Sequence, residues 1–307
     1  MKCYVTRNGQ PVLEDVSEPL PNGNEALIRV SATSLNRGEL SLLGQRRDGW
    51  RPGQDVAGVV VRSAADGAGP KEGSRIVGLV DQASWSELVT VPHVRLSALP
   101  DGVGLAEAAT LPVAGLTALR LVRLGGDLLG RRVLITGASG AVGNVAVQLA
   151  RLAGAQITAV TGDHSAELLR GLGSTDAIPT VDDAVGRFDL VLESVGGPSL
   201  EAVMKKVAAK GTIVTFGNSS GKTASFDLFD FASGGEGARL KTFFSYSVDG
   251  ERTGEDLFTL ATLIDRQLLN PLIDRTVDWR ELASCLQAMK DRQVHGKIVM
   301  TLNAALN

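Results

Sequence analysis

The sequence predicts an α/β fold in which a small β-barrel precedes a doubly wound parallel sheet. Three observations predict it. Short apolar runs separated by Gly and Pro fill the first 112 of the 307 residues, which is typical of a small barrel. Strand and helix patterns then alternate over residues 113–248, which predicts βαβ units. A glycine-rich turn at residues 137–143 joins the first strand of that region to a helix.

The barrel strands are expected where β-branched residues gather. Turn signals separate four such runs, and these are residues 26–30, 56–61, 74–80 and 86–91. At the other end of the sequence, a helix is expected over residues 256–269, where Asn270 and Pro271 end it. A helix at 279–290 and a strand at 297–302 follow.

The glycine turn lies inside a βαβ pattern. Residues 133–136 predict a strand, the apolar spacing after Gly143 predicts a helix that ends at Gly154, and residues 156–160 predict a second strand. A turn of this kind lets the backbone approach a diphosphate, and the helix N-terminus offers free N–H groups. The first glycine of the usual G-x-G-x-x-G pattern is Ala138, so a purely structural turn is the alternative. The phosphate-binding candidates are Ser139, Gly140, Ala141, Val142 and Gly143.

Three later strands complete the predicted sheet, at residues 188–192, 211–216 and 240–244, with a helix at 199–209 between the first two. Ligands of open α/β sheets bind outside the carboxyl ends of the strands. Ser194, Val195 and Gly217 stand at such ends, which makes them candidates for cofactor contact.

Composition narrows the class of protein. The formal net charge of −3 predicts no general attraction to nucleic acid or to an anionic membrane. Cys3 and Cys285 are too few for a disulfide framework or a four-cysteine zinc site, which favours a reducing, cytoplasmic location. Gly or Arg interrupts every long apolar run, and the N-terminus lacks an apolar signal segment, so no membrane span is expected.

One alternative family is excluded. Residues 136–143 approach the Thr-Gly-x-x-x-Gly-x-Gly pattern of short-chain dehydrogenases, but those enzymes carry it at the N-terminus and use a later Tyr-x-x-x-Lys pair. The only tyrosines here are Tyr4 and Tyr246, and Gly250 follows Tyr246 at the lysine position.

Six motifs in order carry a resemblance that runs nearly end to end: residues 34–40, 52–60, 111–118, 137–143, 193–197 and 295–299. With a barrel first and the nucleotide domain second, the chain resembles the medium-chain dehydrogenase/reductase superfamily and, within it, the zinc-free quinone oxidoreductase-like branch. The resemblance implies a GroES-like catalytic domain built from residues 1–112 and 268–307. It also implies a Rossmann domain over 113–267 and an active site in the cleft between the domains.

The expected zinc ligands are missing. Where zinc-dependent relatives carry a cysteine and a Gly-His-Glu histidine, this chain has Asn36 and Gly53-Gln54-Asp55. Zinc needs three or four well-placed ligands, and the three histidines lie far apart in sequence. We therefore expect no metal site. The resemblance then implies hydride transfer from a nicotinamide to a quinone or an enone.

Two residues are candidate catalytic groups because negative charge that develops on a substrate oxygen needs hydrogen-bond donors and a proton. By resemblance, Asn36 lies near the nicotinamide and substrate, and Tyr246 follows the last Rossmann strand. Asn36 as a turn former, Tyr246 as a core residue and water as the proton source are the alternatives. Asp55 is expected to orient barrel loops through backbone N–H groups.

Three further residues are candidates for the cofactor site, two of them, Thr117 and Lys297, by resemblance. Thr117 should lie near the nicotinamide, although an N-terminal helix contact is the alternative. Phe244 is placed at the end of the last Rossmann strand. Lys297 reaches the cofactor or projects from a surface strand.

Cofactor choice is determined at the end of the second strand, where NAD enzymes carry an acid for the ribose 2′-hydroxyl. Thr161 and Gly162 stand there instead, which favours NADPH without excluding NADH. No Lys or Arg follows to hold a 2′-phosphate. Asp163 is a candidate for a ribose hydroxyl, and His164 is a candidate for partial charge or a solvated loop residue.

Three functions stay open for a small-molecule substrate that the residues do not identify. The first is an NADPH-dependent quinone or enone reductase. The second is an enoyl reductase for a carrier-bound or polyketide-like chain, in which the basic loop at 46–51 contacts a phosphopantetheine arm. The third is a crystallin-like NADPH-binding protein with little turnover. A homodimer is expected through the apolar edge strand at 240–245.

Overall fold

The computed structural model describes residues 1–162, 165–231, 234–244 and 252–302. The chain forms two compact units. We call Met1–Leu116 with Asp249–Asn307 the barrel unit, and Thr117–Val248 the sheet unit. The predicted α/β fold class is confirmed, with a mostly antiparallel, barrel-like sheet in the first unit and a parallel sheet in the second.

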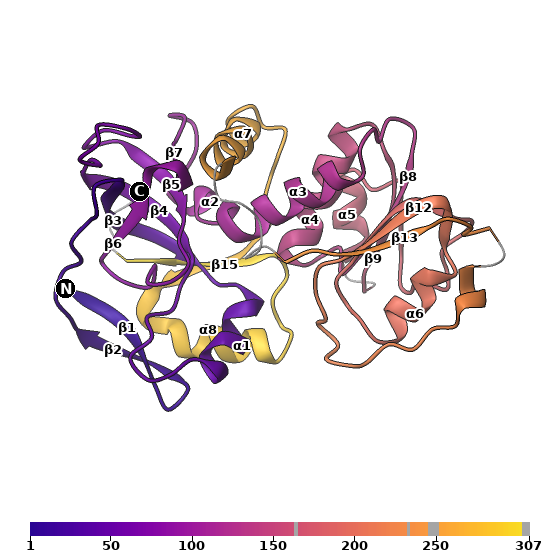
Figure 1. Ribbon diagram of the computed structural model, residues 1–307, viewed down its shortest axis with the longest axis horizontal. Helices are drawn as coiled ribbons and strands as arrows, with labels where there is room; N and C mark the ends of the chain where they lie inside the picture. Colours follow the sequence, from indigo (N-terminus) through magenta and orange to yellow (C-terminus); the bar gives the residue numbers. More distant parts are fainter. Residues whose placement is uncertain (163–164, 232–233, 245–251, 303–307) are drawn as a thin grey trace. The chain divides into compact units, whose positions relative to one another are not determined.

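The barrel unit is built around one main sheet (Figure 1). Its strands are β3 (Glu25–Ser34), β4 (Asp55–Arg62), β5 (Arg75–Leu79), β6 (Leu88–Pro92), β7 (Leu96–Ala98), β14 (Ile273–Asp278) and β15 (Lys297–Thr301). The order is β14-β15-β3-β4-β5-β7, and β6 pairs with β3. The long β3 therefore joins the strands that come early in the chain to β15, which comes last.

A separate hairpin consists of β1 (Lys2–Arg7) and β2 (Gln10–Asp15), and the Tyr4 side chain of β1 belongs to the apolar core of the unit. Asn8 and Gly9 both have positive φ, as a two-residue hairpin turn with the right-handed strand twist requires. The Asn-Gly pair was the sequence signal for this hairpin, which the strand prediction omitted. The Tyr4 ring meets Trp279 edge to face, with ring centroids 5.4 Å apart.

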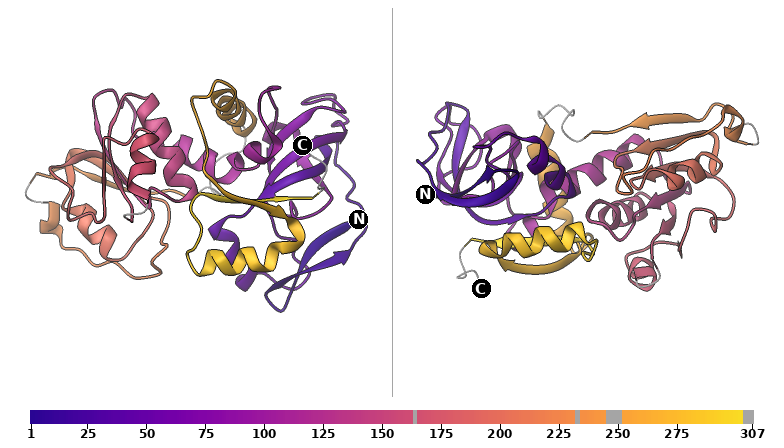
Figure 2. Two further views of the ribbon diagram at one scale, coloured as in Figure 1. Left: turned by 180° about the vertical axis from the view of Figure 1, so that it is seen from behind. Right: turned by 90° about the horizontal axis from the view of Figure 1, so that it is seen from below.

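Helices cover the barrel sheet. They are α1 (Arg37–Gln45), α2 (Leu105–Ala108), α7 (Thr253–Asp265) and α8 (Leu282–Lys290), with short helices η1 (His93–Arg95), η2 (Leu111–Gly115) and η7 (Trp279–Glu281). Figure 2 shows α1 and α8 side by side. The core between sheet and helices is apolar and includes Ile28, Val56, Ile76, Trp85, Leu286 and Met300.

Helix α7 corrects the predicted domain boundary. The prediction assigned it to the Rossmann domain, which was to end at residue 267. In the structure α7 contacts β7, η1 and η2 of the barrel unit. Gly254 explains the fit, because a Cβ at this position would lie 2.5 Å from the Leu96 carbonyl oxygen. The helix backbone therefore packs directly against the end of a barrel strand.

The sheet unit holds six parallel strands: β8 (Arg132–Thr136), β9 (Gln156–Val160), β10 (Asp176–Ile178), β11 (Phe188–Glu193), β12 (Val207–Thr215) and β13 (Arg239–Thr242). Their order, β10-β9-β8-β11-β12-β13, is 3-2-1-4-5-6 in chain order, which is that of the Rossmann fold. The helices are α3 (Leu116–Leu124), α4 (Ala141–Leu152), α5 (Ala166–Gly171), α6 (Pro198–Met204) and the short η4 (Leu228–Phe231).

Two predicted elements of the sheet unit have different bounds. The helix expected over 199–209 ends at Met204, because β12 begins at Val207, which pairs with Phe188. The last strand ends at Thr242, before Phe243 and Phe244. Its position at the edge of the sheet agrees with the prediction.

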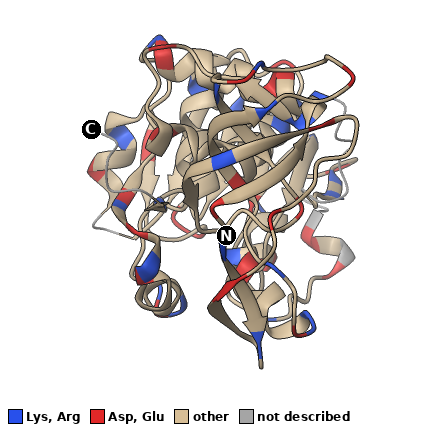
Figure 3. Cartoon of the chain, turned by 90° about the vertical axis from the view of Figure 1, so that its left-hand side faces the viewer, with Lys and Arg blue, Asp and Glu red and all other residues tan. Residues whose placement is uncertain are grey.

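Within the described residues no helix has both the length and the apolar character needed to cross a membrane. Basic and acidic residues are interspersed along the ribbon seen in Figure 3. Several of them form surface ion pairs, such as Arg7 with Glu14 and Arg95 with Asp81.

Candidate functional site

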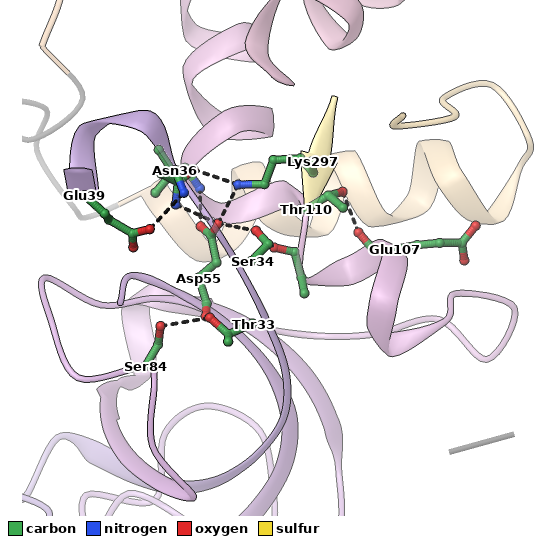
Figure 4. Close-up of polar contacts among 11 residues, drawn as sticks. Thr33, Ser34, Asn36, Glu39, Asp55, Ser84, Glu107, Thr110 and Lys297 are labelled. Carbon is green, nitrogen blue, oxygen red and sulfur yellow. Dashed lines mark hydrogen bonds and ion pairs between the residues drawn. The ribbon is translucent and has the colours of Figure 1, made fainter. Parts of the chain in front are cut away.

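The carboxylate of Asp55 is the centre of a buried polar network in the barrel unit (Figure 4). Its Oδ1 accepts a hydrogen bond of 2.8 Å from the backbone N–H of Val113 in η2. Its Oδ2 accepts from Asn36 Nδ2 (2.9 Å) and lies within hydrogen-bond distance of the Ser34 hydroxyl. The expected role of Asp55 in orienting backbone is therefore present, together with side-chain contacts that were not predicted.

Lys297 supplies the positive charge of this network. Its Nζ lies 2.9 Å from Asp55 Oδ2 and donates to Asn36 Oδ1 at 2.7 Å. The Lys297 side chain is only 2% exposed, so its interpretation as a surface-strand residue is wrong. A buried cation without a partner costs several kcal/mol, and β15 places this lysine directly beside its carboxylate.

Asn36 enters the network from the start of α1, where it is the N-cap. Glu39, at the third helical position, accepts the Asn36 backbone N–H at 2.8 Å, which is one half of a capping box. The Asn36 side chain is thereby directed to Asp55 and Lys297. The residue is both a turn former and part of a polar site, so the two interpretations of its sequence position are compatible.

Glu39 is a fully buried carboxyl group. Burial, followed by the negative charge of Asp55, raises its pKa from the ordinary 4.5 to about 8. Among the described residues, Glu39 Oε1 has no hydrogen-bond partner. Glu39 is therefore protonated at neutral pH, and the network carries one cation and one anion.

In the sheet unit, the predicted glycine turn joins β8 to α4 at the switch point of the sheet, between β8 and β11. Gly137 has a φ of +59° and Gly140 is the N-cap of α4. A Cβ on Gly143 would lie 2.4 Å from the Gly137 carbonyl oxygen. The helix start therefore packs against the turn, and the N–H groups of its first turn have no acceptor within the helix.

Ser194 lies directly beside this turn. A Cβ on Gly137 would lie 2.7 Å from Ser194 Oγ, and one on Gly217 would lie 3.0 Å from the Ser194 carbonyl oxygen. Ser194 also donates its backbone N–H to Thr136 Oγ1 at 2.9 Å. The structure thus brings Ser194, Gly217 and the turn together at the carboxyl ends of their strands.

Glu193 holds the loop that contains Ser194 and Val195. Its buried carboxylate accepts the backbone N–H groups of Val195 (3.0 Å) and Gly196 (3.1 Å). Sequence reasoning included Glu193 only as part of the family motif at 193–197 and gave it no role, although an acid that ends an apolar strand was an available signal.

Thr161 follows β9 and is 7% exposed. Its backbone N–H donates to Ile178, whereas its hydroxyl has no hydrogen-bond partner among the residues that the structure describes. An unpaired buried hydroxyl, a glycine cradle without Cβ and a helix N-terminus together fit a dinucleotide. Gly162 next to Thr161 has open space around its Cα.

Of the remaining predicted site residues, the structure describes Thr117 and Phe244. Thr117 is buried in the first turn of α3. Phe244 is 65% exposed and follows β13, which β11 and β12 separate from the turn. Asp163, His164 and Tyr246 lie outside the described residues.

Metal ligands are not clustered in the described part of the chain, where no group of three or more His, Cys, Asp or Glu is able to hold a metal ion. Glu39 and Ser34 are the barrel-unit residues that sequence reasoning missed. Both residues lie in the family motif at residues 34–40, and Glu39 had a second signal in the Asn-x-x-Glu spacing of a capping box.

The chain is similar in sequence to a dehydrogenase family model and to two curated proteins. A family model described as zinc-binding dehydrogenase matches residues 172–300. The chain is 30% identical over 302 residues to the spectinabilin polyketide synthase system protein NorB of Streptomyces orinoci. This alignment covers 95% of this chain and 14% of that protein. The chain is also 36% identical over 211 residues to the chloroplast envelope quinone oxidoreductase homolog of Arabidopsis thaliana. That alignment covers 62% of this chain and 61% of that protein.

A solved structure is similar over the whole chain. It is an alcohol dehydrogenase superfamily protein from Novosphingobium aromaticivorans, with a TM-score of 0.88 and 26% identity, covering 99% of this chain and 100% of the other. The curated relatives named above are longer than the matched region, since the chain spans about one-seventh of one and three-fifths of the other.

Proposed function

Because the chain belongs to the medium-chain dehydrogenase/reductase superfamily, we propose that it is an oxidoreductase that transfers hydride from NADPH to a quinone or an α,β-unsaturated carbonyl compound. The turn at 137–143 and the loop after β11 would hold the nucleotide, and bound NADPH supplies the hydride. The similarity to a plant quinone oxidoreductase homolog supports this acceptor class.

The position of Asn36 is the observation that carries the choice of a carbonyl acceptor. By family resemblance, this position holds a cysteine ligand in zinc-dependent members. Here it presents a carboxamide, fixed by Lys297 and Asp55. An N–H group that donates to the acceptor oxygen stabilises the negative charge that develops there without a metal ion. Water or Tyr246 would then supply the proton.

The proposal is tested by incubating the purified protein with NADPH and either 1,4-benzoquinone or a simple enone, and by following the loss of NADPH absorbance. NADH is run in parallel. Turnover with either acceptor supports the proposal. Tight NADPH binding without turnover of any acceptor favours a nucleotide-binding protein of low activity instead.

An enoyl reductase is the second candidate function. Its support is the alignment with the polyketide synthase protein NorB over 95% of this chain. In the loop at 46–51, the Arg46 guanidinium lies 5.9 Å from the centre of the Trp50 ring. A crotonyl thioester of phosphopantetheine, compared with the free enone, distinguishes the two functions. Preference for the thioester, lost in Arg47→Ala, supports the carrier-bound substrate.

Thr161 gives a test of cofactor contact. Thr161→Val removes a hydroxyl that has no partner among the described residues. We expect the stability of the nucleotide-free protein to stay unchanged or to rise by about 1 kcal/mol, because an unsatisfied buried group is lost. We expect the dissociation constant for NADPH to rise about 5- to 10-fold, because one hydrogen bond to the ribose or its phosphate is lost.

Isothermal titration with NADPH and with NADH measures the two affinities of Thr161→Val. A larger loss for NADPH supports contact with the 2′-phosphate, and an equal loss supports contact with a ribose hydroxyl. Thr158→Val, within β9, is the matched control. Unchanged affinity for both nucleotides in Thr161→Val would contradict the assignment of Thr161 to the cofactor site.

We also propose a homodimer through the edge strand β13. Leu240 on this strand is 43% exposed, and Phe244 just beyond it is more exposed. Open apolar edges are usually paired or covered. Light scattering should give twice the mass of one chain, and Leu240→Lys should lower it to the mass of a monomer. A wild-type protein of monomeric mass would exclude this pairing.

A further inference from the structure

Asn36 can act as a hydrogen-bond donor only if its carboxamide has the correct orientation. Rotation by half a turn exchanges the oxygen and the nitrogen of a terminal amide. In this structure Oδ1 receives Lys297 Nζ at 2.7 Å and Nδ2 donates to Asp55 Oδ2 at 2.9 Å. A rotated amide would place its NH₂ group against the ammonium and its oxygen against the carboxylate. The charges therefore determine one orientation.

This orientation has a consequence for the second Nδ2–H. Lysine has only donors and an ionised carboxylate only acceptors, so neither partner tolerates the exchange. One Nδ2–H is used by Asp55, and the carboxyl group of Glu39 also lies beside the Asn36 side chain. The cation at Oδ1 polarises the amide and strengthens the remaining N–H as a donor.

We propose that Lys297 is a positioning residue, which acts with Asp55 to present one N–H of Asn36 to the oxygen of the acceptor substrate. This inference rests on the proposed function. Lys297 is 2% exposed and both of the bonds found for it end within the network. It therefore acts through Asn36 and does not itself contact the substrate.

The first test needs no substrate. Side-chain amide signals in nitrogen–proton NMR spectra of the full chain are compared for the wild type and Lys297→Met, and Asn36→Ala identifies the signals of Asn36. We expect the chemical shifts of the two Asn36 side-chain amide protons to differ widely in the wild type. In Lys297→Met the two chemical shifts should become more alike. Signals that do not change in Lys297→Met overturn the proposal.

The second test is a kinetic cycle. We expect Lys297→Met to lower kcat about 100-fold, the size of effect that a misplaced catalytic group produces, while the NADPH dissociation constant stays within about twofold. The double variant with Asn36→Ala should be no slower than Asn36→Ala alone. Losses that multiply in the double variant overturn the proposal, because Lys297 would then act independently of Asn36.

Two further variants separate positioning from loss of folding. Ile298→Val truncates the neighbouring buried side chain of β15 and should keep the wild-type spectra and kcat. If Lys297→Met alone does not fold, the double variant Asp55→Asn with Lys297→Met removes both charges and leaves no unpaired buried ion. It should show the same spectral change. If the wild type reduces no acceptor, the proposed function fails, whereas the spectra still decide whether Lys297 orients Asn36.

Discussion

Gly143→Ala is expected to raise the dissociation constant for NADPH about 10- to 100-fold. The added Cβ would lie 2.4 Å from the Gly137 carbonyl oxygen and 2.7 Å from Ala138 Cα. Both are backbone atoms, so the turn itself must move. Overpacking of this kind costs about 1–3 kcal/mol, and each 1.4 kcal/mol is about tenfold in affinity. Titration calorimetry with NADPH measures the effect.

Gly171→Ala is the matched control in the same unit. Gly171 ends α5, and a Cβ there meets nothing within 4 Å. Alanine is the better helix former by about 1 kcal/mol, so this variant should keep its affinity and lose no stability. Thermal unfolding without nucleotide separates a folding defect from a binding defect in Gly143→Ala. A Gly143→Ala protein with wild-type affinity would mean that the nucleotide does not use this turn.

Glu39→Gln is expected to change how stability depends on pH. The pKa of Glu39 is about 8 in the folded protein and has an ordinary value of 4.5. Between these two values the folded state binds one proton more than the unfolded state. The contribution of Glu39 to the free energy of unfolding is therefore fully present below pH 4.5. It decreases as the pH rises towards 8, by about 1.4 kcal/mol per pH unit. Glutamine does not titrate, so the variant lacks this loss.

Urea unfolding of the wild type and Glu39→Gln at several pH values from 5 to 8 measures the difference. We expect the variant to gain about 4 kcal/mol relative to the wild type across this range. Glu107→Gln is the control, since Glu107 also accepts an N-cap backbone N–H, that of Gly104, at 3.0 Å but is not fully buried. A difference between Glu39→Gln and wild type that is constant with pH would contradict a neutral, buried Glu39.

The sequence predicted what local patterns determine. The glycine turn, its flanking strands and the parallel sheet follow from spacings within about thirty residues, and they agree with the structure. The Asn-Gly hairpin and the Asn-x-x-Glu capping box were equally local signals, although neither was used. Asn36 and Asp55 were recognisable only through family resemblance, which does not give the contact between them.

Local patterns of this kind could not predict contacts between residues that are far apart in the sequence. Lys297 donates to a residue 261 positions earlier in the chain, and no spacing rule connects the two. Its burial follows from the central place of β15 between β14 and β3. The sequence predicted a helix close to the position of α7 but assigned it to the wrong unit, because helix periodicity does not identify the surface that a helix covers.

The placement of β15 has a consequence for how the protein is made. The sheet unit is one continuous segment, Thr117–Val248, so its strands can pair as soon as that segment has left the ribosome. The barrel unit cannot complete its sheet until β15 reaches β3, long after β3 itself was synthesised. Until then Asp55 lacks its lysine, and the edge of β3 that β15 will cover has no partner strand. The interval between the synthesis of these strands is when the chain most needs protection from aggregation.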